Sequence, residues 1–176
     1  MYLEPSPERR YPKVPLERRA YAFLLDFITV WLISSFFIGF FQVIVFIVTW
    51  FGLRVILVEK NKGQSLGRWA FDLKIIDGKF NKIPGIVELA KREGIASFAA
   101  LLAMFGLNIG FANPLSMLLL TTPLLVDCAF VLADEEISQA FHDKIAGTII
   151  VPTRRGFSLD LRIKKLWYEV KRKLKK

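Results

Sequence analysis

The chain has 176 residues, which is the size of one compact unit, and 53% of them are hydrophobic although the formal net charge is +9. Its single cysteine excludes an intramolecular disulfide and any cysteine cluster for zinc or iron–sulfur. A basic balance also suits nucleic acid, but the sequence has no helix-turn-helix, zinc-finger or aromatic–basic pattern. We therefore prefer a membrane surface and expect no nucleic-acid partner.

The first long apolar run extends from Ala20 to Val58 and contains only two charges, Asp26 and Arg54. A bilayer core of about 30 Å is crossed by about 20 helical residues, so a run of 39 residues fits two spans. The turn between them is expected around Gly39, among phenylalanines that suit a membrane interface. No cleavable signal pattern opens the run, so we expect it to remain as an anchor.

A second apolar run, residues 94–133, has Asp127 as its only charge and is interrupted at Gly110–Pro114. The two runs predict an all-α membrane protein of two antiparallel hairpins. The four spans are expected at about residues 20–38, 41–58, 95–111 and 115–133.

The intramembrane charges are placed at matching depths. Asp26 and Arg54 lie 14 residues before and after Phe40, so an antiparallel hairpin puts them at one level. Charged side chains in a bilayer need partners, so we predict that these two pair. Asp127 lies 14 residues beyond the second turn, and Arg19 shares a helical face with Asp26, although alone it is an ordinary interfacial anchor. We predict an intramembrane network of Arg19, Asp26, Arg54 and Asp127.

The distribution of Lys and Arg predicts the orientation. Five precede residue 20, eight lie in residues 59–94 and eleven follow Ala133, whereas both outer turns have none. Because positive charge stays on the cytoplasmic side, we expect both termini inside, in a bacterial inner or internal membrane. Residues 1–17, with four prolines, predict an extended cytoplasmic tail.

The inner connection between the hairpins predicts small structural elements. Ser65 is a plausible N-cap for a helix over residues 66–71, and Leu73–Asp77 has the pattern of a short strand. A second strand is expected in residues 146–152, where it could pair with the first. Pro84 is expected to open the helix that leads into the third span.

The segment after the fourth span contains three consecutive acids at residues 134–136 and the only histidine, His142. Three acids could bind a divalent metal, but we prefer solvated interfacial acids and expect neither metal nor cofactor. His142 is expected to make a structural hydrogen bond, and Cys128 to be a small buried side chain.

Residues 153–176 predict a basic amphipathic helix. Apolar side chains recur at helical spacing from Leu159 to Leu174, and residues 154–176 carry ten positive and two negative side chains. Such a helix lies on an anionic inner leaflet, and docking onto a partner protein is the alternative.

Three sequence pieces resemble the RDD family of small integral membrane proteins, named for one arginine and two aspartates. They are RAYAFLLD from Arg19, GQSLGR from Gly63 with LKIID from Leu73, and FHDKIAGTIIV from Phe141, and together they fall within residues 18–152. The resemblance implies that Arg19 and Asp26 are the named arginine and first aspartate, and that Asp127 or Asp143 is the later one. Further residues in these pieces are Gly67, Arg68, His142, Asp143, Gly147 and Thr148.

The resemblance implies little about activity, since ion transport is suggested for some members and accessory roles for others. The sequence has no P-loop, dinucleotide-binding or GxSxG pattern and no nucleophile–base pair, so we expect no enzyme. Our first hypothesis is an accessory subunit or assembly factor of a larger membrane complex or homo-oligomer. The alternative is a cation/proton transporter in which Asp26 and Asp127 bind the ion.

Overall fold

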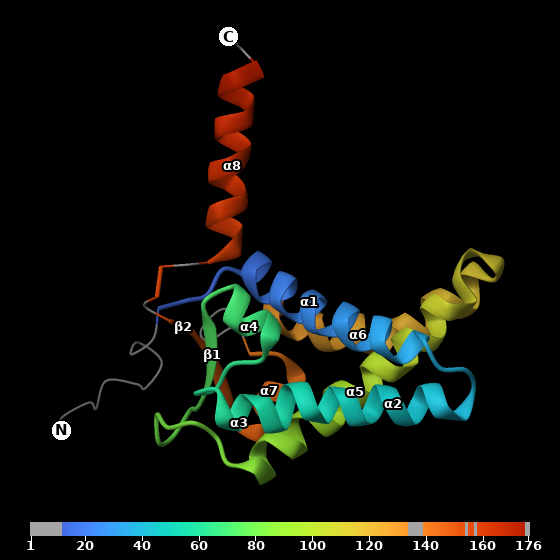
Figure 1. Cartoon of the computed structure of the whole chain (residues 1–176). Helices are drawn as coiled ribbons and strands as arrows, with labels where there is room; N and C mark the ends of the chain where they lie inside the picture. Colours follow the sequence, from blue (N-terminus) through green and yellow to red (C-terminus); the bar gives the residue numbers. More distant parts are fainter. Residues whose placement is uncertain (1–11, 134–138, 154, 157, 175–176) are drawn as a thin grey trace.

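The computed structural model describes residues 12–133, 139–153, 155–156 and 158–174. These residues form a mostly helical structure with one small two-stranded sheet (Figure 1). Three helical stretches are long and apolar enough to cross a membrane: Phe40–Lys60, Ile86–Ile109 and Pro114–Leu132. The acidic residues 134–136 lie outside the described residues, as does most of the predicted tail.

The first hairpin is formed by α1 (Leu16–Ser35) and a longer helix in three consecutive parts. These parts are α2 (Phe40–Phe51), a π-helical turn η2 (Gly52–Ile56) and α3 (Leu57–Lys60). Gly39 enters α2 with a φ of +62°, a conformation that side chains with a Cβ rarely adopt. The turn therefore ends where the sequence predicts it, four residues after α1 stops.

The second hairpin is formed by α5 (Ile86–Ile109) and α6 (Pro114–Ala133), joined by a 3₁₀ turn, η3 (Gly110–Ala112). A Cβ on Gly106 would lie 3.0 Å from the carbonyl oxygen of Met117, so a small residue allows the two helices to approach closely. The helix that Pro84 is expected to open begins at Ile86 and continues without a break into the third span, so Arg92 and Glu93 lie inside it.

Short elements cover the end of the bundle that holds the inner connection. Helix α4 (Leu66–Ala70) begins at Ser65, whose Oγ accepts from the backbone N–H of Arg68 as predicted. The strands β1 (Leu73–Asp77) and β2 (Thr148–Pro152) pair antiparallel, with Ile75 opposite Ile150, which confirms the proposed pairing. Helix α7 (Phe141–Ala146) precedes β2 and packs against α5.

The main apolar core lies between α1, α2 and α5. It is formed by Phe27, Val30, Phe46, Trp50, Ala96, Ala100, Ala103 and Met104. The apolar window of the α5 span is 50% buried, whereas that of α6 is only 11% buried. Helix α6 thus presents most of its leucines outward, as a helix in contact with lipid or with another protein does.

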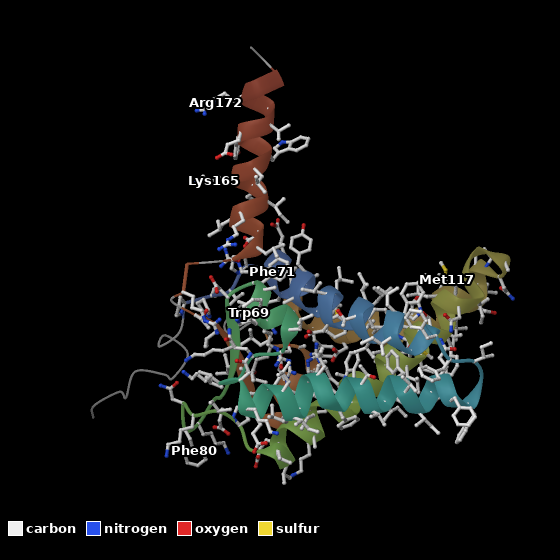
Figure 2. The ribbon with its side chains drawn as sticks, in the orientation of Figure 1. Trp69, Phe71, Phe80, Met117, Lys165 and Arg172 are labelled. Carbon is white, nitrogen blue, oxygen red and sulfur yellow. The ribbon has the colours of Figure 1, made fainter. Side chains whose placement is uncertain are left out.

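Helix α8 (Leu159–Leu174) extends away from the bundle at the end that carries the sheet (Figure 1). It runs across the direction of α1, α2 and α6. Figure 2 shows Lys165 and Arg172 along it, while Met117 marks the opposite end of the bundle. Its base is held by an ion pair in which Arg18 Nη2 lies 3.1 Å from Asp160 Oδ2. The predicted C-terminal helix is present.

Candidate functional site

Asp26 lies in the middle of α1 and is fully buried against the start of α4. Its Oδ2 accepts from Arg54 Nη1 at 2.9 Å and from Ser65 Oγ at 2.6 Å, and its Oδ1 accepts from the backbone N–H of Gly67 at 2.7 Å. The contact between Asp26 and Arg54 predicted from the turn spacing is therefore present. Two further donors, from the inner connection, complete the environment of this carboxylate.

Gly67 makes this arrangement possible. A Cβ at this position would lie 1.9 Å from the carbonyl oxygen of Ala22 and 3.1 Å from Asp26 Oδ1. Only a residue without a side chain lets α4 approach α1 closely enough for the backbone N–H to reach the carboxylate. The glycine of the GQSLGR piece thus has a packing role.

Arg54 lies in the π-helical turn η2, an irregularity common at functional positions. Its guanidinium carbon is 5.0 Å from the ring centre of Phe23 and 4.9 Å from that of Trp50. Arg54 Nε also donates to Glu93 Oε2 at 2.7 Å. The side chain therefore joins two carboxylates from different helices while aromatic rings cover its cation.

Glu93 is the centre of the cluster. Its side chain is fully buried and accepts from Trp50 Nε1 at 3.2 Å, from Arg68 Nη2 at 3.2 Å, from Arg54 and, very closely, from Arg92 Nη1. Sequence reasoning did not name Glu93 or Arg92 as site residues, because both precede the predicted span and were counted with the inner connection. A signal existed, because Glu93 falls on the helical stripe Leu89, Ala96 and Ala100 that faces the core.

Asp143 links the cluster to α7, the short helix before β2. Its Oδ1 accepts from Arg92 Nε at 2.7 Å and its Oδ2 from Arg19 Nη2 at 2.8 Å. Thr148 Oγ1 lies 3.4 Å from Oδ1. Burial alone would raise the pKa of Asp143, but the charges of Arg92, His142 and Arg19 outweigh it and hold the pKa well below its usual range. Asp143 therefore stays ionised.

Asp127, in α6, pairs with His142, which was not part of the predicted intramembrane network. Its Oδ2 lies 2.6 Å from His142 Nδ1, and its Oδ1 accepts from the backbone N–H of His142 at 3.1 Å. His142 Nε2 in turn lies 3.6 Å from Asp143 Oδ1. Asp127 thus joins the cluster through His142, whereas Arg19 joins it through Asp143.

Arg68, in α4, is buried beside two other arginines. Burial, together with the charges of Arg92 and Arg54, lowers the pKa of Arg68 to about 9, although Glu93 and Asp26 oppose the shift. The guanidinium remains charged at neutral pH. Its Nη1 is buried and has no hydrogen-bond partner among the described residues.

Comparison with known families identifies the family of this chain. The RDD family model matches residues 13–147, which is more than half of the chain. The chain belongs to the RDD family. Comparisons with curated proteins and with solved structures give no match. Together with its apolar helices, the family match indicates a membrane protein.

The motif residues of this RDD protein converge on the cluster. Arg19, Asp26, Gly67, Arg68, His142 and Asp143 come from α1, α4 and α7 and meet around Glu93 and Arg92 of α5. Gly147 ends α7 with a φ of +63°, and Thr148 follows at the start of β2. Four arginines thus meet four carboxylates, counting Asp127. Among the described residues no group of three His, Cys, Asp or Glu side chains could hold a metal.

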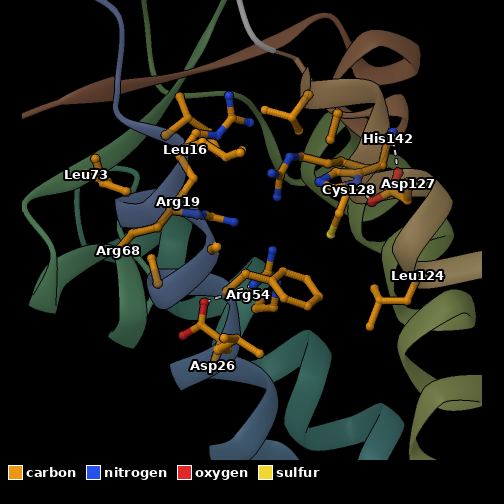
Figure 3. Close-up of a pocket in the computed structure, with 18 of the residues that line it drawn as sticks. Leu16, Arg19, Asp26, Arg54, Arg68, Leu73, Leu124, Asp127, Cys128 and His142 are labelled. Carbon is orange, nitrogen blue, oxygen red and sulfur yellow. Dashed lines mark hydrogen bonds and ion pairs between the residues drawn. The ribbon is translucent and has the colours of Figure 1, made fainter. Parts of the chain in front are cut away.

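A cavity of about 240 Å³ opens between α1 and α6 beside the cluster. Figure 3 shows Arg19, Arg54 and Arg68 on one side of it and Asp127, Cys128 and His142 on the other. The prediction that Cys128 is buried is wrong, because its side chain is exposed and lines the cavity.

Proposed function

We propose that this RDD protein is an integral membrane protein with four spans. Helix α1 would be the first span along the chain, in addition to the three helical stretches that are long and apolar enough to cross a membrane. Helix α1 has 20 residues, about 30 Å at 1.5 Å per residue, and packs against α2. The charged residues of α1 are Glu17, Arg18 and Arg19 at its start and Asp26, whose charge Arg54 neutralises. Exposed Tyr21, Leu24, Ile28 and Leu32 support lipid contact along the rest.

We place both termini in the cytoplasm of a bacterial cell, with the protein in the inner or an internal membrane. The absence of Lys and Arg from both outer turns supports this orientation. In it α8 follows the cytoplasmic surface, since it runs across the direction of the spans (Figure 1).

The function best supported by the geometry is that of a non-catalytic accessory subunit or assembly factor. The observation that carries it is the closed pairing of the buried charges. Asp26, Glu93 and Asp143 each accept from several donors that lie on different elements. Carboxylate oxygens that already accept from several donors have few lone pairs left to bind a cation, which suits a fixed scaffold better than an ion carrier.

The outward surfaces then supply the binding sites of the subunit. The leucines of α6 and the apolar face of α8 are exposed, including Leu115, Leu119, Leu125, Leu132 and Trp167. In a membrane these faces meet lipid, the helices of a larger complex or a second copy of this chain.

The test is a purification of tagged protein at native abundance in a mild detergent, followed by identification of bound proteins. The expected result is a defined complex of larger mass, which a Glu93→Gln variant loses if the cluster shapes the binding surface. Recovery of the protein alone, from both mild and lipid-preserving extractions, would contradict the accessory role.

Cation/proton transport is the second candidate, and one observation favours it. The Asp127–His142 pair lines the cavity that also reaches Asp26. Ion flux in proteoliposomes tests the idea, with Asp26→Asn and Asp127→Asn beside the unchanged chain. Flux that both substitutions abolish would support transport, and flux equal to that of empty liposomes would exclude it.

A further inference from the structure

We propose that the cavity between α1 and α6 binds the anionic headgroup of a membrane phospholipid. The acyl chains of that lipid would lie along the outer faces of the same two helices. This inference rests on the proposed membrane location and is independent of the accessory role.

The first support is the position of the cavity. Helix α1 packs on α2 and α4, and α6 packs on α5 and α7, so the two helices have little direct contact with each other. Figure 3 shows the space between them, with α1 and α6 on opposite sides. If α1 and α6 both span the membrane, this space opens sideways toward lipid.

The second support is the charge of the lining. Of the residues that the structure describes, four arginines line the cavity, Arg19, Arg54, Arg68 and Arg92, against two carboxylates, Asp26 and Asp127. The carboxylates that balance the other arginines, Glu93 and Asp143, lie behind them and do not line the cavity. Asp26 and Asp127 are themselves occupied by their own donors. The inner wall therefore presents an excess of positive charge.

The third support is an unused donor. Arg68 is 3% exposed, and its Nη1 has no hydrogen-bond partner among the described residues. A buried guanidinium N–H without a partner costs free energy, and a phosphate oxygen is its best acceptor. Because Arg68 also lines the cavity, an anionic group there would complete the hydrogen bonding of the cluster.

The mouth of the cavity favours an amphiphile over a free anion. Most of its apolar lining residues come from α1 and α6, and three of these are about half exposed: Leu16, Leu24 and Leu125. A volume of about 240 Å³ is below the roughly 300–1,000 Å³ of pockets that enclose a drug-sized ligand. The cavity would thus hold a phosphate headgroup, while the hydrocarbon chains remain in the groove outside.

The experiment is native mass spectrometry of the full chain, delipidated in an uncharged detergent. Dioleoyl phosphatidylglycerol, dioleoyl phosphatidylcholine or inorganic phosphate is added in separate titrations. We expect one phosphatidylglycerol per chain at concentrations at least tenfold below those at which phosphatidylcholine binds. Inorganic phosphate should not displace it. Equal binding of the two lipids, or full displacement by inorganic phosphate, would overturn the proposal.

Two variants place the bound lipid. Arg68→Gln removes the unused donor and should weaken phosphatidylglycerol binding at least tenfold. Leu125→Trp fills the mouth without touching the charge cluster and should weaken it similarly. Leu118→Trp is the matched control, because Leu118 is as exposed as Leu125, at 57%, on the same helix but outside the cavity lining. Unchanged binding by Leu125→Trp would refute this location even if Arg68→Gln failed to fold.

Helix α8 needs its own control because its cations could hold an anionic lipid. The triple variant Lys164→Gln, Lys165→Gln and Arg172→Gln should keep the bound phosphatidylglycerol. Loss of the lipid in this variant, with binding retained by Leu125→Trp, would assign the lipid to α8 and overturn the cavity site. Failure of the membrane location itself would be seen separately, as release of the chain from membranes by alkaline carbonate.

Discussion

Arginine and lysine side chains have two different roles in this protein. In the buried cluster Arg19, Arg54, Arg68 and Arg92 meet four carboxylates, and each cation has an ion-pair partner. The carboxylates are Asp26, Glu93, Asp143 and Asp127, the last joined through His142. In α8 the cations are exposed and exceed the acids: Arg162, Lys164, Lys165, Lys171 and Arg172 against Asp160 and Glu169. Burial therefore comes with charge balance, and exposure comes with charge excess.

The difference follows from the surroundings of each set. Removing a charge from water costs several kcal/mol, so buried cations require fixed carboxylates and their loss leaves an unpaired charge. Exposed cations remain hydrated and gain about 1 kcal/mol each from an anionic surface. The cluster should therefore govern folding, and α8 should govern surface association.

The largest effect is expected for Glu93→Gln. Trp50, Arg54, Arg68 and Arg92 all donate to this carboxylate, so its neutralisation leaves buried cations without compensation. We expect a loss of about 3–5 kcal/mol in the free energy of unfolding, measured by dodecyl sulfate titration in mixed micelles. Glu88→Gln, on an exposed position of the same helix, should change it by less than about 0.5 kcal/mol. Similar effects of the two variants would refute the central role of Glu93.

A smaller effect is expected for Asp26→Asn. The amide oxygen can still accept from the backbone N–H of Gly67, and Arg54 keeps its contact with Glu93. The variant loses the charge-assisted bond to Arg54, so the same titration should give a loss of about 1.5–3 kcal/mol. An equal or larger loss than for Glu93→Gln would place the centre of the cluster at Asp26 instead.

Gly67→Ala tests the packing that brings α4 to the cluster. The added Cβ meets the carbonyl oxygen of Ala22 at 1.9 Å, so α1 and α4 must separate, and we expect a loss of about 1–3 kcal/mol. Gly94→Ala is the matched control within α5, where a Cβ meets no atom within 4 Å. It should stabilise the helix by about 0.5–1 kcal/mol. Thermal unfolding of both variants in detergent should show shifts of opposite sign.

The comparison also explains how far the sequence could be interpreted. The hairpins, both turns, the strand pairing and the Asp26–Arg54 contact depend on local patterns and on distances along the chain from a turn. Such patterns can be recognised in the sequence alone, because they do not depend on how distant segments pack. The family resemblance located Arg19, Arg68 and Asp143 in sequence, although nothing in one sequence could say which carboxylate each arginine meets.

The rest depended on helix boundaries and packing. Arg92 and Glu93 lie just before the apolar run of residues 94–133, so neither was counted among the intramembrane charges, although both belong to α5. The π-helical turn at Arg54 has no sequence signature, yet it forms part of the cluster. Cys128 was misplaced because a lone cysteine in an apolar helix gives no sign of which face is covered.

The exposed cations of α8 should act singly and weakly. Lys164→Gln or Lys165→Gln should each weaken the attachment of α8 to phosphatidylglycerol nanodiscs by about 1 kcal/mol, because each removes one surface charge. Hydrogen–deuterium exchange of α8 amides should then accelerate about fivefold. In phosphatidylcholine nanodiscs the unchanged chain and both variants should exchange alike. A difference there would mean that these lysines contact protein and not lipid.

The smallest effect lies where the two regions meet, at the Arg18–Asp160 pair. Partial burial would raise the pKa of Asp160, but hydrogen bonds from Ser158 and Arg18 outweigh it and lower the pKa. Because the folded pKa is lowered, the pair stabilises the base of α8 above the ordinary carboxyl pKa of about 3.9 and loses this effect as the pH falls through the lowered value. Arg18→Gln should therefore raise amide exchange at the base of α8 by about two- to fivefold at neutral pH, as expected for a partly exposed ion pair of about 0.5–1 kcal/mol. Arg18→Lys should preserve most of the protection against amide exchange.

In uncharged detergent near pH 2, the amide exchange rates at the base of α8 should be the same in Arg18→Gln and in the unchanged chain, once intrinsic exchange rates are corrected. A difference that persists there would show that Arg18 holds α8 through contacts other than the carboxylate.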